Sequence, residues 1–479
     1  MIGLIQNKQN YEYDIRSLIL AFMIDEKIEL TEDTASSIYD FILKVQFAES
    51  QTSISIYENG TILEEKTVPG DYKDKTYFKN QFKIGLYQVL SKYSNKKLPW
   101  GTLTGIRPTK LIMKELHQGQ QKEQIVPKLK EKYLISDEKL HLSLDVVERE
   151  EALMKSIDVE QGYSLYIGIP FCPTTCLYCS FTSYPIKQYE NIIQDYLNAV
   201  VKEIAFVSQE YKNRKLISLY IGGGTPTTLT ANQMKWLFEQ LQHYFDFSNV
   251  VEITVEAGRP DSITKEKLRV LYDAGVHRIS INPQTMNDKT LKVIGRGHSV
   301  EQVLKSFYEA REVGIDNINM DTICGLPGES MKEIRHTYEE IFKLNPESLT
   351  VHSLALKRTS KLRQLKEEYS FGATREMISY AHEMAYEMGM NPYYLYRQKN
   401  IPGNFENVGF SKEGKECYYN ILIMEELHDI IAVGAGASSK IKGAKGQEIY
   451  RVENLKDIHQ YIDRIDEMII RKKNALERR

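Results

Sequence analysis

The stretch Tyr166-Ile-Gly-Ile-Pro-Phe-Cys172-Pro-Thr-Thr-Cys176-Leu-Tyr-Cys179 holds three of the five cysteines of the chain, spaced C-x3-C-x2-C. It follows the short apolar, β-branched run 165–169, which predicts a strand, so the thiols lie at the C-terminal end of that strand. An odd number of cysteines, most of them in one place, argues against a disulfide framework and favours a metal site.

The spacing distinguishes between kinds of metal site. A structural zinc ion takes four ligands, and residues 180–183 include no cysteine or histidine to supply the fourth. A [4Fe–4S] cluster held by three cysteines leaves one iron open to a substrate or cofactor. The alternatives are an incomplete zinc site and three buried structural thiols. Cys324 and Cys417 are expected to be buried apolar residues.

Around this stretch, short apolar runs alternate with amphipathic helical stretches. The runs are residues 165–169, 217–221, 251–255, 278–282, 318–323 and 349–354, and the helical stretches are 189–210, 231–244, 265–274, 301–313 and 331–344. This alternation predicts an α/β fold, a parallel sheet with right-handed crossovers. Six strands are too few for a closed eightfold barrel, which leaves a partial barrel or an open doubly wound sheet. Both place their site at the C-terminal ends of the strands.

The N-terminal part has mixed signals. Helical periodicity at 11–22, 34–47 and 75–93 accompanies strand patterns at 53–57 and 61–67, which flank Asn59-Gly60, typical of a type I′ hairpin turn. These patterns predict an α+β accessory domain over residues 1–160. Residues 105–110 are either an anion-binding loop at a helix start or a solvated turn.

The alternation fades near the C-terminus. The segments in order are a helical stretch at 373–388, a strand-like run at 418–424, a glycine-rich segment at 434–439 and charged helices. Together they predict a small C-terminal module over residues 373–479, which packs on the sheet and closes the site.

Composition and charge narrow the class of protein. The 479 residues include 62 basic and 65 acidic side chains, and this net charge of −3 gives no support to nucleic-acid binding through bulk charge. No apolar run approaches the ~18 residues that span a bilayer. Residues 1–6 lack the basic segment and apolar core of a secretory signal. We expect a cytoplasmic protein of about three domains without a membrane span.

The cysteine stretch resembles that of the radical S-adenosylmethionine (SAM) enzymes. Within them it is most similar to the oxygen-independent coproporphyrinogen III oxidase family, which reads Y-x-H-I-P-F-C here. Further motifs match in order at the predicted strand ends, and they are Gly222-Gly223-Gly224-Thr225-Pro226-Thr227, Glu256, Ser280-Ile281-Asn282-Pro283-Gln284 and Asp321-Thr-Ile-Cys-Gly325-Leu326-Pro327-Gly328. The resemblance covers roughly residues 162–440 and implies a partial (β/α)6 barrel of radical SAM type over residues 161–372.

The resemblance also implies the cofactors. Cys172, Cys176 and Cys179 would hold a [4Fe–4S] cluster, whose open iron binds the methionine amino and carboxylate groups of SAM. One electron from the cluster then cleaves SAM to a 5′-deoxyadenosyl radical. The SAM contacts that the resemblance implies are Tyr166, Gly224, Thr225, Glu256, Gln284, Arg296 and Asp321.

Several of these roles agree with the chemistry of the side chains. Glu256 ends an apolar strand, where a carboxylate needs a partner such as a cationic cofactor. Gln284 and Asp321 carry acceptors for ribose hydroxyls, and Arg296 can pair with a carboxylate. The structural alternatives are a tight turn for the glycines, surface or helix-capping roles for the polar residues and a core position for Tyr166.

Two departures separate the chain from the demonstrated oxidases. Gly168 replaces the histidine of the motif, and Phe181 stands where those oxidases have a further cysteine. The Cys-Ser-Phe ending is similar to the coproporphyrinogen dehydrogenase (HemZ) and haem chaperone (HemW) branches, and the long N-terminal extension favours HemZ. Lys440, after the glycine-rich segment, replaces an apolar contact of the family's second SAM site.

The resemblance therefore implies a radical SAM oxidoreductase that decarboxylates coproporphyrinogen III to protoporphyrinogen IX without oxygen, in haem biosynthesis. One alternative is a haem-binding trafficking protein that keeps the cluster, and another is a different radical enzyme acting on a tetrapyrrole. The expected partners are a tetrapyrrole substrate and an electron donor such as a reductase, a flavodoxin or a ferredoxin. His352 and the run Tyr393, Tyr394, Tyr396, Arg397 are either tetrapyrrole contacts or ordinary structural residues.

Overall fold

A computed structural model describes residues 1–23, 26–70, 74–105, 107–179, 181–355, 361–365, 368–398, 401–443 and 448–479. Its strands are β1 Ile2–Gln6, β2 Ile28–Leu30, β3 Phe41–Phe47, β4 Gln51–Glu58, β5 Thr61–Pro69, β6 Gly162–Ile169, β7 Phe171–Cys172, β8 Tyr184–Pro185, β9 Lys215–Gly223, β10 Glu252–Glu256, β11 Arg278–Ser280, β12 Ile318–Cys324, β13 Ser348–Ser353, β14 Asn391–Arg397, β15 Glu406–Ser411, β16 Asp429–Val433, β17 Ser438–Lys442 and β18 Ile449–Glu453. Its α-helices are α1 Glu12–Phe22, α2 Lys75–Ser94, α3 Thr109–His117, α4 Lys122–Tyr133, α5 Asp137–Met154, α6 Ile193–Glu210, α7 Ala231–Tyr244, α8 Lys265–Asp273, α9 Asp288–Val293, α10 Val300–Val313, α11 Met331–Leu344, α12 Arg375–Glu387, α13 Tyr418–Glu425, α14 Ile458–Asp463 and α15 Ile465–Leu476.

Two of the sequence motifs are only partly covered. Position 106 of the 105–110 turn and position 180 of the Cys-Ser-Phe ending lie outside the described residues. Among the helices that are described, none combines the length and the apolar character needed to cross a bilayer.

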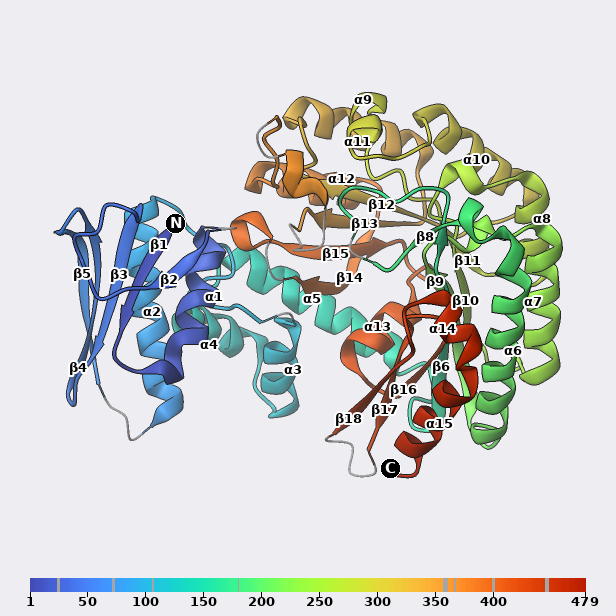
Figure 1. Cartoon of the computed structure of the whole chain (residues 1–479), viewed down its shortest axis with the longest axis horizontal. Coiled ribbons are helices and arrows are strands. Elements are labelled where there is room, and N and C mark those ends of the chain that lie inside the picture. Colours follow the sequence, from blue (N-terminus) through green and yellow to red (C-terminus); the bar gives the residue numbers. More distant parts are fainter. Residues whose placement is uncertain are drawn as a thin grey trace.

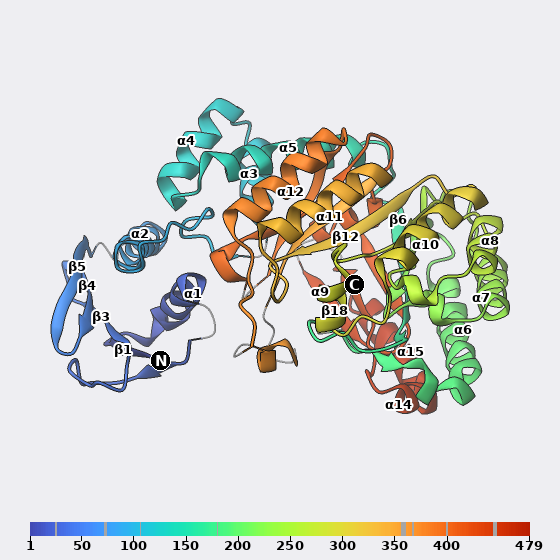
Figure 2. The ribbon, with the colours of Figure 1, turned by 90° about the horizontal axis from the view of Figure 1, so that it is seen from above.

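The N-terminal part is a five-stranded sheet with α1 and α2, at one end of the molecule (Figures 1 and 2). Its strand order is β2-β1-β3-β4-β5, and β4 and β5 form the predicted hairpin, with Asn59 and Gly60 at φ 47° and 80°. The helix predicted at 34–47 is wrong, because residues 41–47 form β3, paired with both β1 and β4. The domain boundaries at 160 and 372 stay predictions.

The described residues form a second sheet of eleven strands in the order β14-β15-β13-β12-β11-β10-β9-β6-β16-β17-β18. Its six central strands, β6 and β9 to β13, are parallel, and neighbours in the sequence are neighbours in the sheet. This sequential order lacks the reversal of a doubly wound sheet, so the crossover helices share one face. Figures 1 and 2 show α6, α7, α8, α10 and α11 along the outer side. The sheet is open, ending at β14 and β18, and the predicted partial barrel is confirmed.

C-terminal strands extend this sheet at both ends. Antiparallel β15 joins β13, and β16 joins β6 in parallel, so the strand before the cysteines has neighbours on both sides. The strand predicted at 418–424 is wrong, because these residues form α13. Glu252 of β10 accepts hydrogen bonds from the backbone N–H groups of Tyr418 (3.0 Å) and Tyr419 (3.4 Å), which stabilises the first turn of that helix.

A buried network ties the C-terminal helix α15 to α6 and to the glycine-rich segment. Lys472 of α15 donates to the carboxylate of Glu203 on α6, and both side chains are almost completely buried. Glu203 also accepts from the backbone N–H of Gly434 (2.9 Å) and from Tyr461 (2.7 Å). The network therefore fixes the turn after β16, next to the strand that leads to the cysteines.

Replacing Lys472 by alanine leaves the Glu203 carboxylate buried without its cation. Removing one partner of such a pair typically costs about 3–5 kcal/mol, so we expect a loss of that order in the free energy of unfolding, measured by urea denaturation. Lys202 is the matched control, since it lies on α6 next to Glu203 and pairs with Asp466 of α15 at the surface (2.6 Å). Lys202→Ala should cost less than ~1 kcal/mol, and equal losses in the two variants contradict the prediction.

Candidate active site

The cysteine loop, residues 172–179, is held at the C-terminal ends of the strands by contacts on both sides. Phe171–Cys172 pairs with Tyr184–Pro185, which closes the loop at its base. The backbone N–H of Leu177 donates to the carbonyl of Ile294 (3.0 Å), which attaches the middle of the loop to the segment after α9. Cys172, Cys176 and Cys179 are all partly exposed and line one cavity of about 520 Å³.

The donor set of this cavity fits a four-iron cluster. Among the described residues, no three His, Cys, Asp or Glu side chains converge closely enough to hold a single metal ion. A [4Fe–4S] cluster does not require such convergence, because each thiolate binds a different iron. The neighbouring groups donate to sulfur, since the Thr225 hydroxyl lies 3.5 Å from Cys172 Sγ and Arg259 Nη1 lies 3.6 Å from Cys176 Sγ.

The glycine turn at the end of β9, residues 222–225, packs directly on the strand that leads to the cysteines. The N–H of Gly224 donates to the carbonyl of Ile169 (2.9 Å), and the N–H of Thr225 donates to that of Phe171 (2.7 Å). A Cβ atom on Gly224 would lie 2.6 Å from the Phe171 carbonyl oxygen. The glycine is therefore required for this close approach. Gly224 and Thr225 both line the cavity, and their contact with the cofactor stays a prediction.

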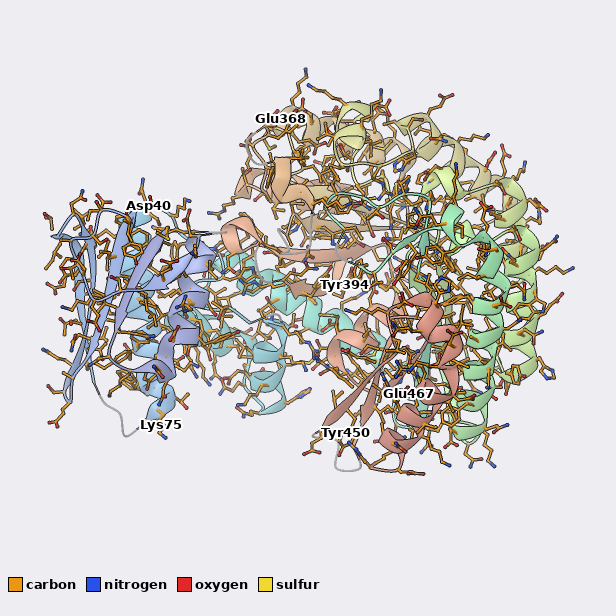
Figure 3. All side chains as sticks on the ribbon, in the orientation of Figure 1. Asp40, Lys75, Glu368, Tyr394, Tyr450 and Glu467 are labelled. Atoms are coloured by element: carbon orange, nitrogen blue, oxygen red, sulfur yellow. The ribbon has the colours of Figure 1, made fainter. Side chains whose placement is uncertain are left out.

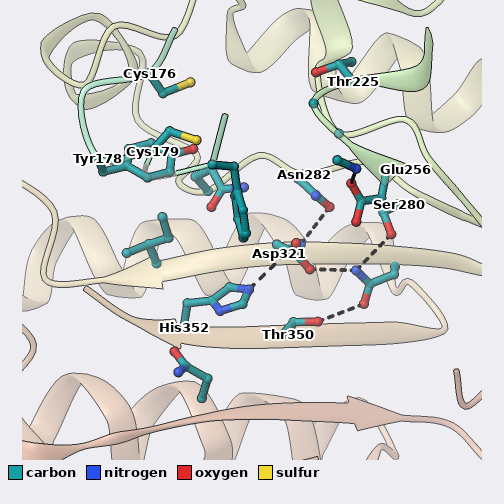
Figure 4. Close-up of a pocket in the computed structure, with 18 of the residues that line it drawn as sticks. Cys176, Tyr178, Cys179, Thr225, Glu256, Ser280, Asn282, Asp321, Thr350 and His352 are labelled. Atoms are coloured by element: carbon teal, nitrogen blue, oxygen red, sulfur yellow. Dashed lines mark hydrogen bonds and ion pairs between the residues drawn. The ribbon is translucent and has the colours of Figure 1, made fainter. Parts of the chain in front are cut away.

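Glu256 lies at the end of β10 with its carboxylate in the cavity (Figure 4). Tyr220 donates to it at 2.6 Å and the N–H of Gly223 at 3.2 Å. Burial raises the pKa of Glu256 to about 7, although these two hydrogen bonds act in the opposite direction. A cationic ligand would stabilise the ionised form of a carboxyl group that is buried in this way.

Gln284 follows the end of β11, and Asp321 lies within the neighbouring strand β12. Gln284 has φ 67°, a conformation that non-glycine residues adopt rarely, and its backbone N–H donates to the carbonyl of Asp321 (2.9 Å). Burial opposes ionisation of Asp321, but contacts from His352 Nε2 (3.8 Å) and Asn319 (2.7 Å) outweigh it and lower its pKa. Both side chains line the cavity, and Figure 4 shows Asp321 between Asn282 and His352.

Arg296 also lines the cavity, and protein oxygens already occupy much of its guanidinium. It donates to Tyr178 Oη (2.7 Å) and to the carbonyls of Gly258 (2.6 Å) and Asn282 (2.7 Å). These contacts join the cysteine loop to the ends of β10 and β11. The predicted pairing of Arg296 with the SAM carboxylate therefore stays a prediction, beside a positioning role that the geometry shows.

Tyr166 lies behind the glycine turn. Its ring stacks on those of Tyr220 and Tyr419, both with centroids 6.1 Å away. The described lining of the cavity includes Tyr220 but not Tyr166. This position corresponds to the structural alternative, a core tyrosine that supports Glu256 through Tyr220, and direct contact of Tyr166 with SAM stays a prediction.

Sequence reasoning missed three residues that shape the site. Arg259 donates to Thr174 of the cysteine loop and pairs with Asp261 (2.7 Å). Its position in the sequence, three residues after Glu256, is the feature that could have indicated a role in the site. Tyr178, inside the cysteine stretch, binds Arg296. The third residue, Arg278, starts β11 and was read only as part of a strand.

The wall opposite the cysteines is aromatic and polar. It is formed by His352, Tyr394, Tyr396, Gln398, Asn407 and Asn420. Figure 3 shows Tyr394 in the interior of the molecule, whereas Lys75 and Tyr450 lie at its edge. Lys440 is absent from the described lining and pairs with Glu426 (3.2 Å). The residues of this wall and the cysteines give the cavity two chemically different ends.

The sequential parallel sheet and the cysteine loop over its strand ends define the class of protein. Residues 166–341 match the family model described as the Radical SAM superfamily. The fold is also that of the solved structure of coproporphyrinogen III oxidase (HemN) from Escherichia coli, a radical SAM enzyme, with a TM-score of 0.54 and 24% identity over 67% of this chain and 73% of that chain. The chain is a radical SAM protein, a class whose cofactors are a [4Fe–4S] cluster and SAM.

Two relatives refine the assignment. The chain is 42% identical to the oxygen-independent coproporphyrinogen-III oxidase-like protein HemZ of Bacillus subtilis, over 91% of this chain and 90% of the relative. It is 32% identical to the heme chaperone HemW of the same organism, over 64% of this chain and 76% of that protein. The chain belongs to the oxygen-independent coproporphyrinogen-III oxidase-like family, and the predicted resemblance to HemZ is confirmed.

Proposed function

We propose that the chain is an oxygen-independent oxidative decarboxylase that converts coproporphyrinogen III to protoporphyrinogen IX. The observation that carries the proposal is that the cysteine loop, the glycine turn and Glu256, Gln284 and Asp321 open into one cavity, whose opposite wall is aromatic and polar. One end suits SAM at a cluster, and the other suits a macrocycle of pyrrole rings with carboxylate side chains. Relatives named for coproporphyrinogen oxidation support the same substrate class.

Each group of residues has a role in this reaction. When bound, the cluster and SAM supply a radical that abstracts hydrogen from the substrate. The three cysteines hold the cluster, Glu256 accepts hydrogen bonds from the SAM amino group, and Gln284 and Asp321 accept them from the ribose. Tyr394 and Tyr396 offer ring faces to the macrocycle and exclude water from it. A cytoplasmic reductase, flavodoxin or ferredoxin provides the electron.

The test is an anaerobic assay with the reconstituted chain. SAM, a reductant and coproporphyrinogen III are added, and vinyl-bearing porphyrin and 5′-deoxyadenosine are measured after oxidation of the products. The proposal expects both products to form together. Formation of 5′-deoxyadenosine without any decarboxylated porphyrin contradicts it.

A second candidate is a haem-binding trafficking protein. The observation that favours it is His352, a cavity imidazole able to bind haem iron, together with the similarity to heme chaperone HemW. Stoichiometric haem binding that is lost in His352→Ala, without turnover of coproporphyrinogen, would support this function.

The pKa of Glu256 leads to a pH-dependent prediction. Because the ionised carboxylate accepts hydrogen bonds from the SAM amino group and attracts the sulfonium cation, SAM affinity should fall about tenfold per pH unit below a pKa of about 7 and level off above it. In Glu256→Gln, the affinity at pH 8 should be about 10- to 100-fold weaker and nearly independent of pH. Equilibrium dialysis of the cluster-loaded protein measures both effects. Equal affinities of the parent chain at pH 6 and pH 8 rule out the assigned role.

A further inference from the structure

Arg278, the first residue of β11, is a buried cation without an ionic partner among the described residues. Its side chain is 1% exposed, and it lines the same cavity as the cysteines. Among the described residues, its one hydrogen bond runs from Nη2 to the neutral hydroxyl of Ser348, at 3.2 Å. The Nε atom is buried and has no partner.

Other deeply buried cations among the described residues have an ion pair or several hydrogen-bond acceptors. Lys139 pairs with Glu406 (2.6 Å), Arg259 pairs with Asp261 (2.7 Å), and Lys472 pairs with Glu203. Arg397, which has no such pair, donates to the carbonyls of Leu103 and Gly105 and to Asn404. Burying a guanidinium without an acceptor is costly, so its retention in the cavity wall points to an anionic ligand.

The nearby carboxylate of Glu252 favours the charged form of Arg278 through space, but its oxygens are already engaged by other donors. It accepts hydrogen bonds from Cys417 Sγ (3.2 Å) and from the first backbone N–H groups of α13. The two carboxylates of the described cavity lining, Glu256 and Asp321, also have partners of their own. The guanidinium of Arg278 therefore stays available to a ligand.

The surroundings of Arg278 can complete a carboxylate site. Ser280 lies two residues later on the same strand, so both side chains face the cavity with Arg278 one layer deeper. Asn420 of α13 also lines the cavity and donates to Tyr393 Oη at 3.2 Å. These neutral polar groups can donate hydrogen bonds to an anion without adding charge.

We propose that Arg278 is a substrate-binding residue, which forms a subsite at the inner end of the cavity for one carboxylate side chain of the substrate. This inference rests on the proposed function for the identity of the substrate, a tetrapyrrole that carries propionates. The subsite anchors a group that keeps its carboxylate and so positions the ring for reaction at another side chain.

The first experiment tests the subsite without a tetrapyrrole. Thermal unfolding of the reconstituted full-length chain is followed with propionate and with propionamide, its neutral counterpart. The parent chain should be stabilised by propionate only, and Arg278→Met should lose this effect. Because methionine keeps an unbranched apolar stem, the ligand-free Arg278→Met protein should stay folded, with an unfolding midpoint near that of the parent. Equal stabilisation of both proteins by propionate overturns the proposal.

The second experiment measures binding of coproporphyrin III and of its tetramethyl ester by fluorescence. Arg278→Met should weaken binding of the acid about 10- to 100-fold and leave binding of the ester unchanged. Arg278→Lys, which keeps the positive charge, should retain part of the affinity for the acid. Ser348→Ala is the matched control, since it removes the hydrogen-bond partner of Arg278 and leaves its charge. It should change the affinity by less than about twofold.

The outcomes separate the two proposals. If the parent binds no tetrapyrrole but shows the Arg278-dependent effect of propionate, the subsite stands and the proposed function fails. If the parent and Arg278→Met bind coproporphyrin III equally, the subsite fails and the proposed function stands.

Discussion

Replacing Cys176 by alanine should abolish assembly of the iron–sulfur cluster and, with it, all cleavage of SAM. The three thiols of the loop share one cavity, and each is assigned to a different iron. Loss of one thiolate leaves a second iron without a protein ligand. Among the described residues, no other cysteine lines the cavity and could replace it. The measurements are iron and sulfide content, the visible spectrum after anaerobic reconstitution, and formation of 5′-deoxyadenosine.

Cys324→Ala is the control for this variant. Cys324 is buried, and its sulfur lies 3.7 Å from Tyr338 Oη, away from the cysteine loop. The control should keep the full cluster spectrum and lose only a modest amount of stability, on the order of 1 kcal/mol. A Cys176→Ala protein with an intact cluster would overturn the ligand assignment.

Replacing Gly224 by alanine should reduce SAM cleavage about 100-fold, because displacements near 1 Å in a reaction site have effects of this size. The added Cβ would lie within 2.9 Å of three backbone atoms, namely the carbonyl oxygens of Phe171 and Ile169 and the carbonyl carbon of Pro170. Backbone atoms cannot rotate away as a side chain does. The glycine turn must therefore separate from the strand that leads to Cys172.

The measurements for Gly224→Ala are the rate of 5′-deoxyadenosine formation and the unfolding midpoint. Overpacking of this kind also costs about 1–3 kcal/mol of stability. Gly105→Ala is the matched control, since a Cβ there meets no atom within 4 Å and the residue has no positive φ. If Gly224→Ala cleaves SAM at the parent rate, the tight packing of the turn has no part in cofactor binding.

The parallel sheet could be predicted because its signals are local. Each of the six central strands is a β-branched apolar run followed by an amphipathic helix, and all six lie where the sequence predicts them. The place of the site could be predicted in the same way, because polar residues near the C-terminal ends of parallel strands meet at one edge of the sheet. The cysteines, Gly224, Thr225, Glu256, Gln284, Arg296 and Asp321 do line one cavity.

The two wrong elements depend on contacts between distant parts of the chain. The run Tyr418–Glu425 is short and apolar, which fits a strand or a helix equally well. The carboxylate that caps it belongs to Glu252, 166 positions before Tyr418. Residues 41–47 became a strand because β1 and β4 flank them in the sheet. No local pattern contains this information.

Arg278 was missed for a different reason. Within a strand, a single arginine resembles a solvent-exposed edge residue, and only the structure reveals that its side chain is enclosed. What distinguishes it is the lack of an acidic partner, which is a property of the neighbourhood and not of the residue.

The pairing of β16 with β6 sets the order in which the protein can be completed during synthesis. The strand Gly162–Ile169, which carries the cysteine loop, gains its second neighbour only when Asp429–Val433 has left the ribosome. Chains grow at about 5–20 residues per second, so this edge stays open for roughly ten seconds to a minute after the cysteines emerge. Iron–sulfur delivery during translation would therefore meet a loop on an unfinished sheet, and delivery after release would meet a finished one.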